Sequence, residues 1–387
     1  MKILYSHRIG SRDGQGVHLE AMVAALRAAG HTVQVVGPAS FADTALGQDN
    51  RVVTLLRQML PSWVGELAEL AYVVPSTLRL SRAAAELKPD IIYERANLFH
   101  LAGAWVSARR GIPLLLEVNA PLAEERARFG QLKLRRIAGA IERLAWRRAT
   151  RVLPVTDVLA QRIAEAGVPQ SRISVVPNGI DLADFPKALS QGPSREEVVL
   201  GFVGFVRGWH GLDHVIRSLA QYSGKPKLTL QIVGDGPARG ELEQLARELG
   251  VISQVQFTGL THRQHIPELV RRFDIALQPA AVPYASPLKV FEYMAAARAI
   301  VAPDQPNLRE ILEHDRTALL FQPGDVNDMW SAVVRLAQDP GLRQRLGEAA
   351  RAEVFSRDLT WEGNARRVLS LASALRGQAS VSMRQAP

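Results

Sequence analysis

The sequence predicts an α/β protein with two doubly wound domains that face each other across a cleft. Short apolar, β-rich runs alternate with helix-like segments along most of the chain. The alternation forms two arrays of similar size, and the polar, proline-containing stretch 184–195 separates them. A length of 387 residues with 47% hydrophobic residues is sufficient for two full cores. Functional residues are therefore expected in the loops that follow the strands.

The first array begins at the N-terminus with the predicted strand Lys2–Ser6, which is too short for the apolar core of a signal peptide. A helix from about Val17 to Ala29 follows, with Gly30 as its C-cap. Further strands are predicted at 32–36, 91–94, 113–118, 151–156 and 173–177. Continuous apolar runs of this kind suit a parallel sheet that is covered on both faces.

The second array has six predicted strands, at 198–203, 228–233, 255–257, 275–278, 299–302 and 318–321. We expect domains at 1–185 and 186–360. Residues 361–387 are expected to form a C-terminal helix that crosses back to the first domain, followed by a frayed tail.

The segment Ser286–Ala296 is the most informative stretch. Ser286 is a good N-cap and Pro287 suits the first helical position, so the free N–H groups of the first turn, from Leu288 onward, would form an anion site. Lys289 and Glu292 are three residues apart and share a helix face. A cation beside a carboxylate fits the diphosphate and the ribose of a nucleotide. The alternative is a surface salt bridge on an ordinary capped helix.

Glycine-bearing loops follow several predicted strands. They are 6–18, 204–211 with Arg207, 233–237 and 257–260. Glycines allow the backbone to approach a ligand closely, and an arginine can bind a diphosphate through its guanidinium fork. The first loop lacks the G-x-G-x-x-G spacing, so NAD is not supported. Taken singly, each loop could also be a plain turn.

In their order and spacing these motifs resemble the family-four retaining glycosyltransferases, which have the GT-B fold of two Rossmann-like domains. The resemblance covers roughly residues 1–370 and includes a Ser-Pro-x-Lys-x-x-Glu-Tyr pattern. The matching pieces are 14–18, 27–33, 176–181, 203–211, 232–237, 257–259, 286–296 and 300–302.

The resemblance implies an acceptor-binding domain followed by a nucleotide-sugar domain. Glu292 would accept hydrogen bonds from the ribose hydroxyls, and Arg207 with Lys289 would neutralise the diphosphate. The remaining donor-site residues would be Gly16, Gly234, Gly259, Ser286, Pro287 and Leu288. On the acceptor side the candidates are His18, Glu94, Arg95, Glu117 and Asn119, with buried structural pairing as the alternative for Glu94, Arg95 and Glu117.

Four positions depart from the family pattern. The usual Arg and Lys of the loop near 205–210 would fall at Phe205 and His210, and we infer that Arg207 and Lys289 take their place. Tyr284 stands where many members have a glutamate, which affects the contacts to the sugar hydroxyls. Asn119 stands where a histidine is common; an asparagine can hydrogen-bond a sugar or a phosphate but cannot shuttle a proton at neutral pH. We assign Asn119 a catalytic position together with Arg207 and Lys289.

The resemblance implies an enzyme that moves a sugar, with retention, from a nucleotide-sugar (a UDP-sugar is favoured) to a glycan or lipid-linked acceptor in polysaccharide or glycolipid biosynthesis. Leaving-group stabilisation would dominate catalysis. The sequence contains no Asp-x-Asp pair, so we expect neither a metal nor another cofactor. A sugar-nucleotide epimerase of similar architecture and a catalytically degenerate nucleotide-binding scaffold remain alternatives.

The segment 126–151 carries nine Lys or Arg and one acid, Glu142, within a net charge of +9. Its apolar residues recur at helical spacing: Leu134, Ile137, Ala138, Ile141, Leu144, Ala145 and Ala149. The helix could lie on an anionic membrane and present a lipid-linked acceptor, or pack on its own domain with solvated charges. We therefore expect a cytoplasmic protein, with peripheral association at the inner face of the cytoplasmic membrane as an option. The segment lacks an interleaved aromatic platform on which bases could stack, so we expect no nucleic-acid partner.

Overall fold

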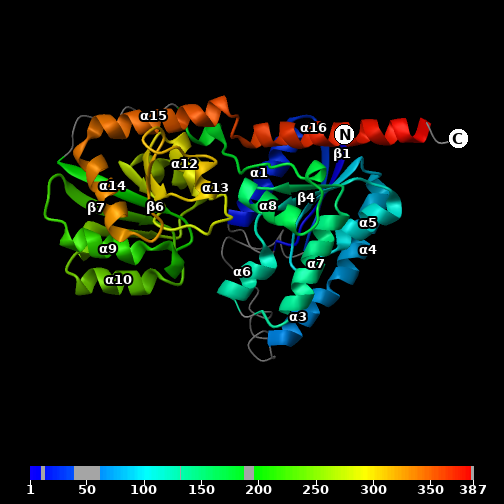
Figure 1. The fold of residues 1–387 in the computed structure, drawn as a ribbon, viewed down its shortest axis with the longest axis horizontal. Helices are drawn as coiled ribbons and strands as arrows, with labels where there is room; N and C mark the ends of the chain where they lie inside the picture. Colours follow the sequence, from blue (N-terminus) through cyan, green and yellow to red (C-terminus); the bar gives the residue numbers. More distant parts are fainter. Residues whose placement is uncertain (10–13, 39–61, 131, 187–195, 385–387) are drawn as a thin grey trace. The chain divides into compact units, whose positions relative to one another are not determined.

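The computed structural model describes residues 1–9, 14–38, 62–130, 132–186 and 196–384. The chain divides into two compact units (Figure 1). Unit 1 comprises Met1–Pro177 and Trp361–Pro387, and unit 2 comprises Asn178–Thr360. The sequence pattern of residues 41–72 is less regular and predicts mixed helix and loop. Most of that segment, and most of the stretch 184–195, lies outside the described residues.

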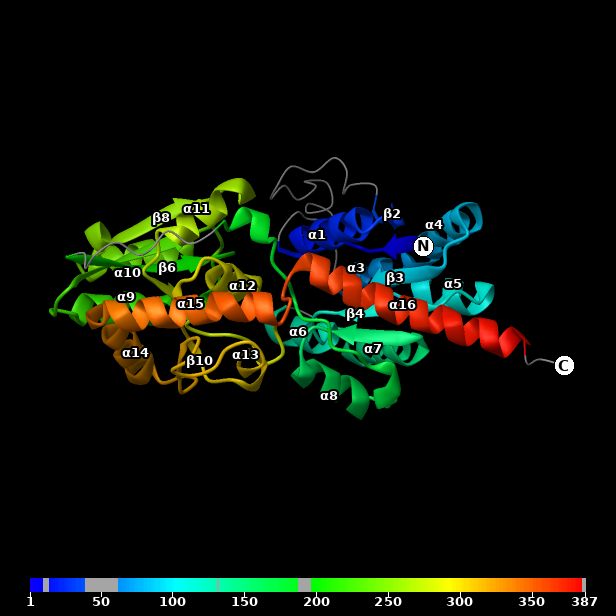
Figure 2. The ribbon, with the colours of Figure 1, turned by 90° about the horizontal axis from the view of Figure 1, so that it is seen from above.

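Unit 1 is built on a parallel five-stranded sheet of order β2-β1-β3-β4-β5. The strands are β1 (Lys2–Ser6), β2 (Thr32–Val36), β3 (Ile91–Arg95), β4 (Leu114–Val118) and β5 (Arg151–Pro154). The helices are α1 (Gly14–Ala28), α3 (Ser62–Ala71), α4 (Val73–Leu87), α5 (Ala102–Arg110), α6 (Leu122–Phe129), α7 (Arg135–Arg148), α8 (Asp157–Glu165) and α16 (Trp361–Arg384). In this unit α16 lies beside α1 (Figure 2).

Unit 2 is built on a parallel six-stranded sheet of order β11-β10-β9-β6-β7-β8. The strands are β6 (Glu197–Val203), β7 (Lys227–Val233), β8 (Val255–Gly259), β9 (Ile275–Leu277), β10 (Ala299–Pro303) and β11 (Leu319–Phe321). The helices are α9 (Leu212–Gln221), α10 (Arg239–Glu248), α11 (Ile266–Arg271), α12 (Leu288–Ala295), α13 (Pro306–Arg309), α14 (Val326–Gln338) and α15 (Pro340–Ser356). All six strands predicted for this array are present, within two residues at each end.

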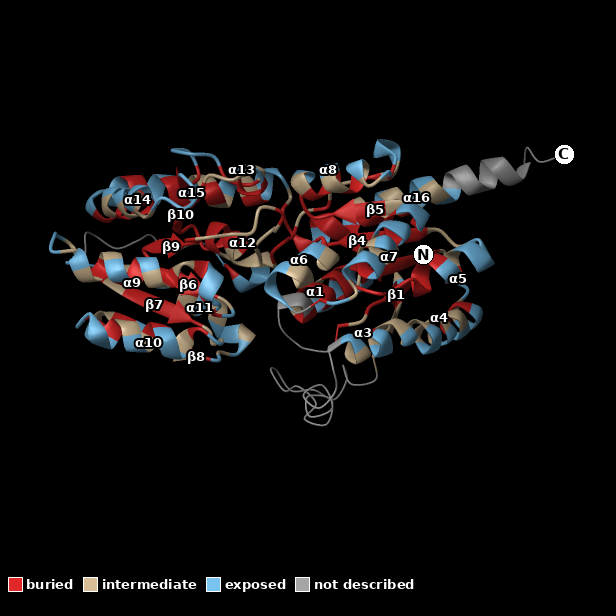
Figure 3. Ribbon diagram, turned by 60° about the horizontal axis from the view of Figure 1, so that its bottom comes forward, coloured by how far each residue is buried: buried red, intermediate tan, exposed pale blue. Residues whose placement is uncertain are grey.

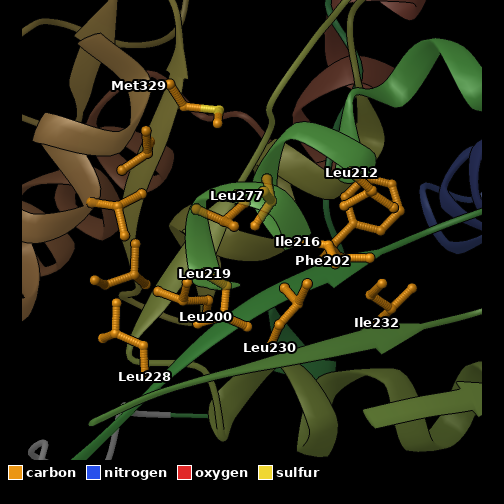
Figure 4. Packing of buried hydrophobic residues seen from close by; sticks show 14 of the residues in the cluster. Leu200, Phe202, Leu212, Ile216, Leu219, Leu228, Leu230, Ile232, Leu277 and Met329 are labelled. Atoms are coloured by element: carbon orange, nitrogen blue, oxygen red, sulfur yellow. The ribbon is translucent and has the colours of Figure 1, made fainter. Parts of the chain in front are cut away.

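The alternation of side chains along the strands of unit 2 divides its core into two clusters. Leu200 and Leu230 face α9, α10 and α14, and this cluster is drawn in Figure 4. Val203 and Ala276 face the other way, toward α11 and α12. The sheet is thus covered on both faces, which explains its continuous apolar strands, and burial concentrates in the strands and the inner sides of the helices (Figure 3).

The expected strand at 173–177 is wrong. Ser174 N–H donates to the carbonyl of Val152, so the segment runs beside β5. Only one bridge, from Val152 to Ile173, has ladder geometry. The apolar composition predicted the location correctly, but the ladder is too short to form a strand.

The predicted apolar face of the basic helix is partly wrong. In α7 the buried residues are Ala138, Ala145 and Trp146, whereas Ile137 and Leu144 are 44% and 39% exposed. The helix packs on its own unit along a narrower stripe than its apolar residues suggested, which leaves two aliphatic side chains among its exposed arginines.

Candidate active site

The loops after β6 and β7 pack directly on each other in unit 2. Gly204 N–H donates to the carbonyl of Val233 at 2.9 Å, and Val206 N–H donates to that of Asp235 at 2.9 Å. Gly234 has φ +128°, and a Cβ there would lie 2.2 Å from the carbonyl oxygen of Gly204. The glycines noted in the sequence are therefore required for the two loops to meet.

Lys289, in the first turn of α12, extends to the end of β6. Its Nζ lies 3.8 Å from the centroid of the Phe202 ring and 3.1 Å from the position that a Cβ on Gly204 would occupy. Gly204 thus leaves room for the ammonium group. Burial lowers the pKa of Lys289 to about 7, although the carboxylate of Glu292 opposes this shift.

Arg207 lies in the loop after β6 and stacks on Phe205, with its Cζ 5.0 Å from the ring centroid. Its backbone N–H donates to Nδ1 of the buried His210 at 3.1 Å. Burial, together with the positive charges of Lys289 and Arg207, lowers the pKa of His210 to about 2. His210 is therefore neutral, and both cations lie near it.

Glu292 lies one turn after Lys289 on the same side of α12. Burial raises its pKa to about 7, against the lowering effect of Arg263 and Lys289, and Asp184 raises it further. Among the described residues, neither Lys289 nor Glu292 has an ion-pair partner within 4 Å. The surface salt bridge that the sequence left open is not formed.

The start of α12 differs from the expectation. The N-cap is Pro287, not Ser286, and no side chain caps the helix. Ser286 is instead bound by Asn178, whose backbone N–H donates to Ser286 Oγ at 3.4 Å and whose Nδ2 donates to the Ser286 carbonyl at 2.5 Å. Val290 N–H donates to the carbonyl of Pro287 at 3.0 Å, and no side chain caps the helix, so the N–H groups of Leu288 and Lys289 are the ones available to an anion.

No role was predicted from the sequence for two side chains that hold these loops, Asn307 and Tyr293. Asn307 Nδ2 donates to the carbonyls of Val282 and Ala285, at 3.2 and 2.7 Å. Tyr293 Oη accepts the N–H of Val203 at 3.0 Å and donates to the carbonyl of Leu277. A buried amide or phenol in an apolar stretch gives no local pattern, and its partners are distant in the sequence.

Gly259 ends β8 with φ +70° and forms a bridge with Gly234. A Cβ on Gly259 would lie 2.9 Å from Nη1 of Arg239, which pairs with Asp235 at 3.2 Å. The loop after β7 thus contacts both the loop after β6 and the loop after β8. Arg207, Gly234, Gly259, Ser286, Lys289 and Glu292 all lie at this edge of the unit 2 sheet.

The acceptor-side candidates lie in unit 1, where Glu117 is the centre of a buried polar cluster. Its carboxylate accepts hydrogen bonds from Tyr93 Oη at 2.7 Å, Arg95 Nη1 at 2.9 Å and Asn119 Nδ2. Burial would raise the pKa of Glu117, but the charge of Arg95 and the hydrogen bonds from Asn119 and Tyr93 favour the ionised form, and the pKa is lowered. Asn119 is therefore engaged by this carboxylate, which fixes its amide.

His18 joins this cluster as a neutral ring. Burial lowers its pKa to about 4, so its Nδ1 accepts a hydrogen bond from Arg95 Nη1 at 2.7 Å. The ring meets the indole of Trp361, the first residue of α16, edge-on at 4.7 Å between centroids. His7 is neutral for a similar reason, because burial and the nearby Arg95 lower its pKa to about 4.

Glu94 does not pair with its neighbour Arg95. Its Oε2 accepts hydrogen bonds from Ser6 Oγ and from the N–H of Gly103, both at 2.9 Å, and the side chain is buried. A Cβ on Gly103 would overlap the carboxylate at 2.6 Å. Glu94 therefore accepts a hydrogen bond from the first turn of α5. Gly16 is buried in the first turn of α1.

The described residues contain no cluster of three potential metal ligands, and none of their helices is long and apolar enough to cross a membrane.

Two parallel α/β units, each with loops that follow the carboxyl ends of its strands, define a doubly wound two-domain α/β protein. Two family models match the chain almost end to end: Glycosyltransferase Family 4 over residues 12–184 and Glycosyl transferases group 1 over residues 187–353. The chain belongs to the family-four glycosyltransferases and has the GT-B fold.

Two curated relatives illustrate the range of the family. The glycogen synthase of Mycobacterium tuberculosis is 26% identical over 371 residues, which cover 90% of this chain and 88% of the relative. A 2-deoxystreptamine glucosyltransferase of Streptomyces kanamyceticus is 29% identical over 216 residues, covering 52% of this chain and 54% of that protein. The match thus spans about half the length of the second relative.

Solved structures share the fold. Anabaena Alr3699/HepE, crystallised in complex with UDP, has a TM-score of 0.74 at 21% identity, with 97% of this chain and 100% of that chain covered. The sucrose-phosphate synthase of Thermosynechococcus elongatus has a TM-score of 0.77 at 16% identity, with 98% and 100% covered.

Proposed function

We propose that this glycosyltransferase moves a sugar, with retention of configuration, from a UDP-sugar to a glycan or lipid-linked acceptor. The observation that carries the proposal is the pair of cations, Lys289 and Arg207, that both lie near the neutral His210 and have no ion-pair partner among the described residues. UDP is chosen as the nucleotide because the Anabaena neighbour was crystallised with it.

In the proposed donor complex the diphosphate lies against the first turn of α12, beside Lys289 and within reach of Arg207. Glu292 accepts hydrogen bonds from the ribose hydroxyls, which favour its ionised form. The glycine loops that end β7 and β8 bring the backbone close to the rest of the nucleotide.

The difficult step is the departure of the diphosphate, because negative charge grows on its bridging oxygen while the sugar becomes oxocarbenium-like. Lys289, Arg207 and the α12 amides stabilise that charge without reorganising, and one such donor is commonly worth about 3 kcal/mol. The departing phosphate takes the proton of the acceptor hydroxyl. No side-chain base is then needed. Asn119 positions the acceptor, and the amide of Asn119 is itself held by Glu117, which Arg95 and His18 contact in turn.

The first experiment is a nucleotide screen. Thermal shift with UDP, GDP and ADP should give the largest increase with UDP, and the response to UDP should persist in EDTA. Release of UDP from UDP-glucose, UDP-galactose or UDP-N-acetylglucosamine should require an added acceptor. Interconversion of the sugar without an acceptor would instead favour an epimerase, and binding without turnover would favour a degenerate scaffold.

We further propose that α7 and its surroundings dock on an anionic membrane. Ile137 and Leu144 lie exposed among the exposed arginines of α7, and Trp63 of α3 is 50% exposed. Buried Glu66 of α3 accepts the N–H groups of Lys133 and Leu134, which ties α3 to the start of α7. Each basic residue near such a surface contributes about 1 kcal/mol.

Liposome flotation tests this docking. Wild-type protein should float with vesicles containing phosphatidylglycerol at low salt and should not float with pure phosphatidylcholine. The double variant Ile137→Ser/Leu144→Ser should float less, whereas the control Phe355→Ser, which changes a residue of unit 2 that is 54% exposed, should not. Equal flotation of all three proteins would contradict the assignment.

A further inference from the structure

Unit 2 contains a cavity that is not lined by Arg207, Lys289 or Glu292 of the proposed donor site. This cavity, of about 310 Å³, opens between the loop after β6, the residues that follow β9 and the turn after β11. The strands β6 and β9 are neighbours, yet their connections lead to α9 and α12, which pack on opposite faces of the sheet. The cavity therefore lies at the topological switch point, where sheets of this kind bind ligands.

One wall of the cavity is apolar. Met329 and Pro279 are buried and line its interior, while the indole of Trp209 is 38% exposed. The Trp209 ring packs on that of His210, with 4.0 Å between centroids, and His210 is itself fixed by the backbone N–H of Arg207. The exposed indole surface is thus held in place beside the cavity.

The rim of the cavity is polar and carries acidic groups. Asp213 and His214 stand in the first turn of α9, with 3.7 Å between Oδ2 and Nδ1. Asp325 is the N-cap of α14, and its Oδ1 accepts the N–H of Asp328 at 3.0 Å. Among the described residues, the lining contains two carboxylates but neither lysine nor arginine. A phosphate group would be repelled here, in contrast to the edge at Lys289.

We propose that this cavity binds a neutral hexose residue of the acceptor glycan; this rests on the proposed function. A pyranose ring presents a C–H face that packs on an indole and hydroxyls that donate to carboxylates, which is the combination found here. The volume is at the lower end of ligand sites, which begin at about 300 Å³, and accommodates one or two sugar rings. The cavity lies on the α9 and α14 side of the sheet, so the donor site and this subsite are separate.

Saturation-transfer NMR with neutral oligosaccharides, in the presence of UDP, tests the proposal. The probes are maltotriose, cellotriose, chitotriose and mannotriose. At least one should bind wild-type protein, and Trp209→Ala should weaken its affinity by at least about tenfold, or 1.4 kcal/mol. Trp105→Ala is the matched control, because Trp105 is 52% exposed in unit 1 and should not affect binding.

Two further variants keep the test decisive if Trp209→Ala folds poorly. Asp325→Asn preserves a good N-cap and removes one carboxylate, and Val326→Trp fills the cavity. Both should lose the saccharide and retain wild-type affinity for UDP. The proposal is overturned if no probe binds wild-type protein, if these variants bind the probe normally, or if glucose 6-phosphate binds the cavity more tightly than glucose. If wild-type protein does not bind UDP, the proposed function itself is refuted.

Discussion

The two units place charged side chains in opposite circumstances. In unit 1 the carboxylate of Glu117 is enclosed by donors from Tyr93, Arg95 and Asn119, and its ionised form is favoured. In unit 2 burial shifts the pKa values of Lys289 and Glu292 to about 7, and no ion pair among the described residues compensates either charge. The first arrangement is satisfied by the chain itself, whereas the second leaves two ionisable groups with shifted pKa values and without an ion-pair partner among the described residues, a combination typical of functional sites.

The largest effect should come from breaking the unit 1 cluster. Arg95→Met leaves the charge of Glu117 buried and uncompensated, which should destabilise the unit by about 3–5 kcal/mol. The urea midpoint measures this. The double variant Arg95→Met/Glu117→Gln should recover part of the loss.

The control for that experiment is an exposed pair. Arg162 and Glu124 lie 2.6 Å apart with side chains 32% and 55% exposed. Arg162→Met should cost less than about 1 kcal/mol. If both arginine variants shift the urea midpoint equally, the cluster does not stabilise unit 1 in the way described.

Lys289→Met should show the reverse pattern in unit 2. Loss of one donor to the departing diphosphate should lower kcat about 100-fold. The melting temperature should stay the same or rise, because a partly desolvated charge is removed. Steady-state kinetics and thermal unfolding on the same preparation measure both effects; near-normal turnover would contradict the role of Lys289.

Gly204→Ala should disturb the donor site in two ways, by steric contact with Lys289 and by backbone strain. The position has φ +139°, and the added Cβ would lie 3.1 Å from Lys289 Nζ, so the affinity for UDP should fall several-fold. Gly30→Ala is the matched control, with φ +82° and no neighbour within 4 Å. It should lower the melting temperature without changing the Kd for UDP measured by calorimetry.

The smallest expected effect is the uptake or release of protons when UDP binds, which tests whether Lys289 and Glu292 of unit 2 titrate near neutral pH. At pH 8 free Lys289, with a pKa of about 7, is mostly neutral, and a bound diphosphate should protonate it, so about one proton is taken up. At pH 6 free Glu292 is mostly protonated, and ribose hydroxyls should ionise it, which releases a proton.

Calorimetry in buffers of different ionisation enthalpy measures both quantities. Lys289→Met should abolish the uptake at pH 8, and Glu292→Gln should abolish the release at pH 6. Equal proton exchange at the two pH values would show that these groups do not titrate as the structure indicates.

Much of the fold was predictable because its signals are local. Apolar runs placed all eleven described strands within two residues at each end. A local signal also marked the glycines at 204, 234 and 259, where a close approach between loops or a positive φ requires that residue type; their contacts with a ligand stay a prediction. Local rules were weaker at Ser286, because Asn178, more than one hundred residues away in the sequence, binds it.

By itself, the sequence determined the two arrays, the loops that end their strands, and the cation and carboxylate spaced along one face of α12. The tertiary structure alone decided which charges are satisfied. Glu94 and Arg95 are adjacent in the chain, yet they have different partners. Glu94 accepts hydrogen bonds from Ser6 and Gly103, whereas Arg95 donates to Glu117 and His18. Adjacent residues of a strand point to opposite faces of the sheet, so their partners, and hence their pKa values, depend on what packs on each face.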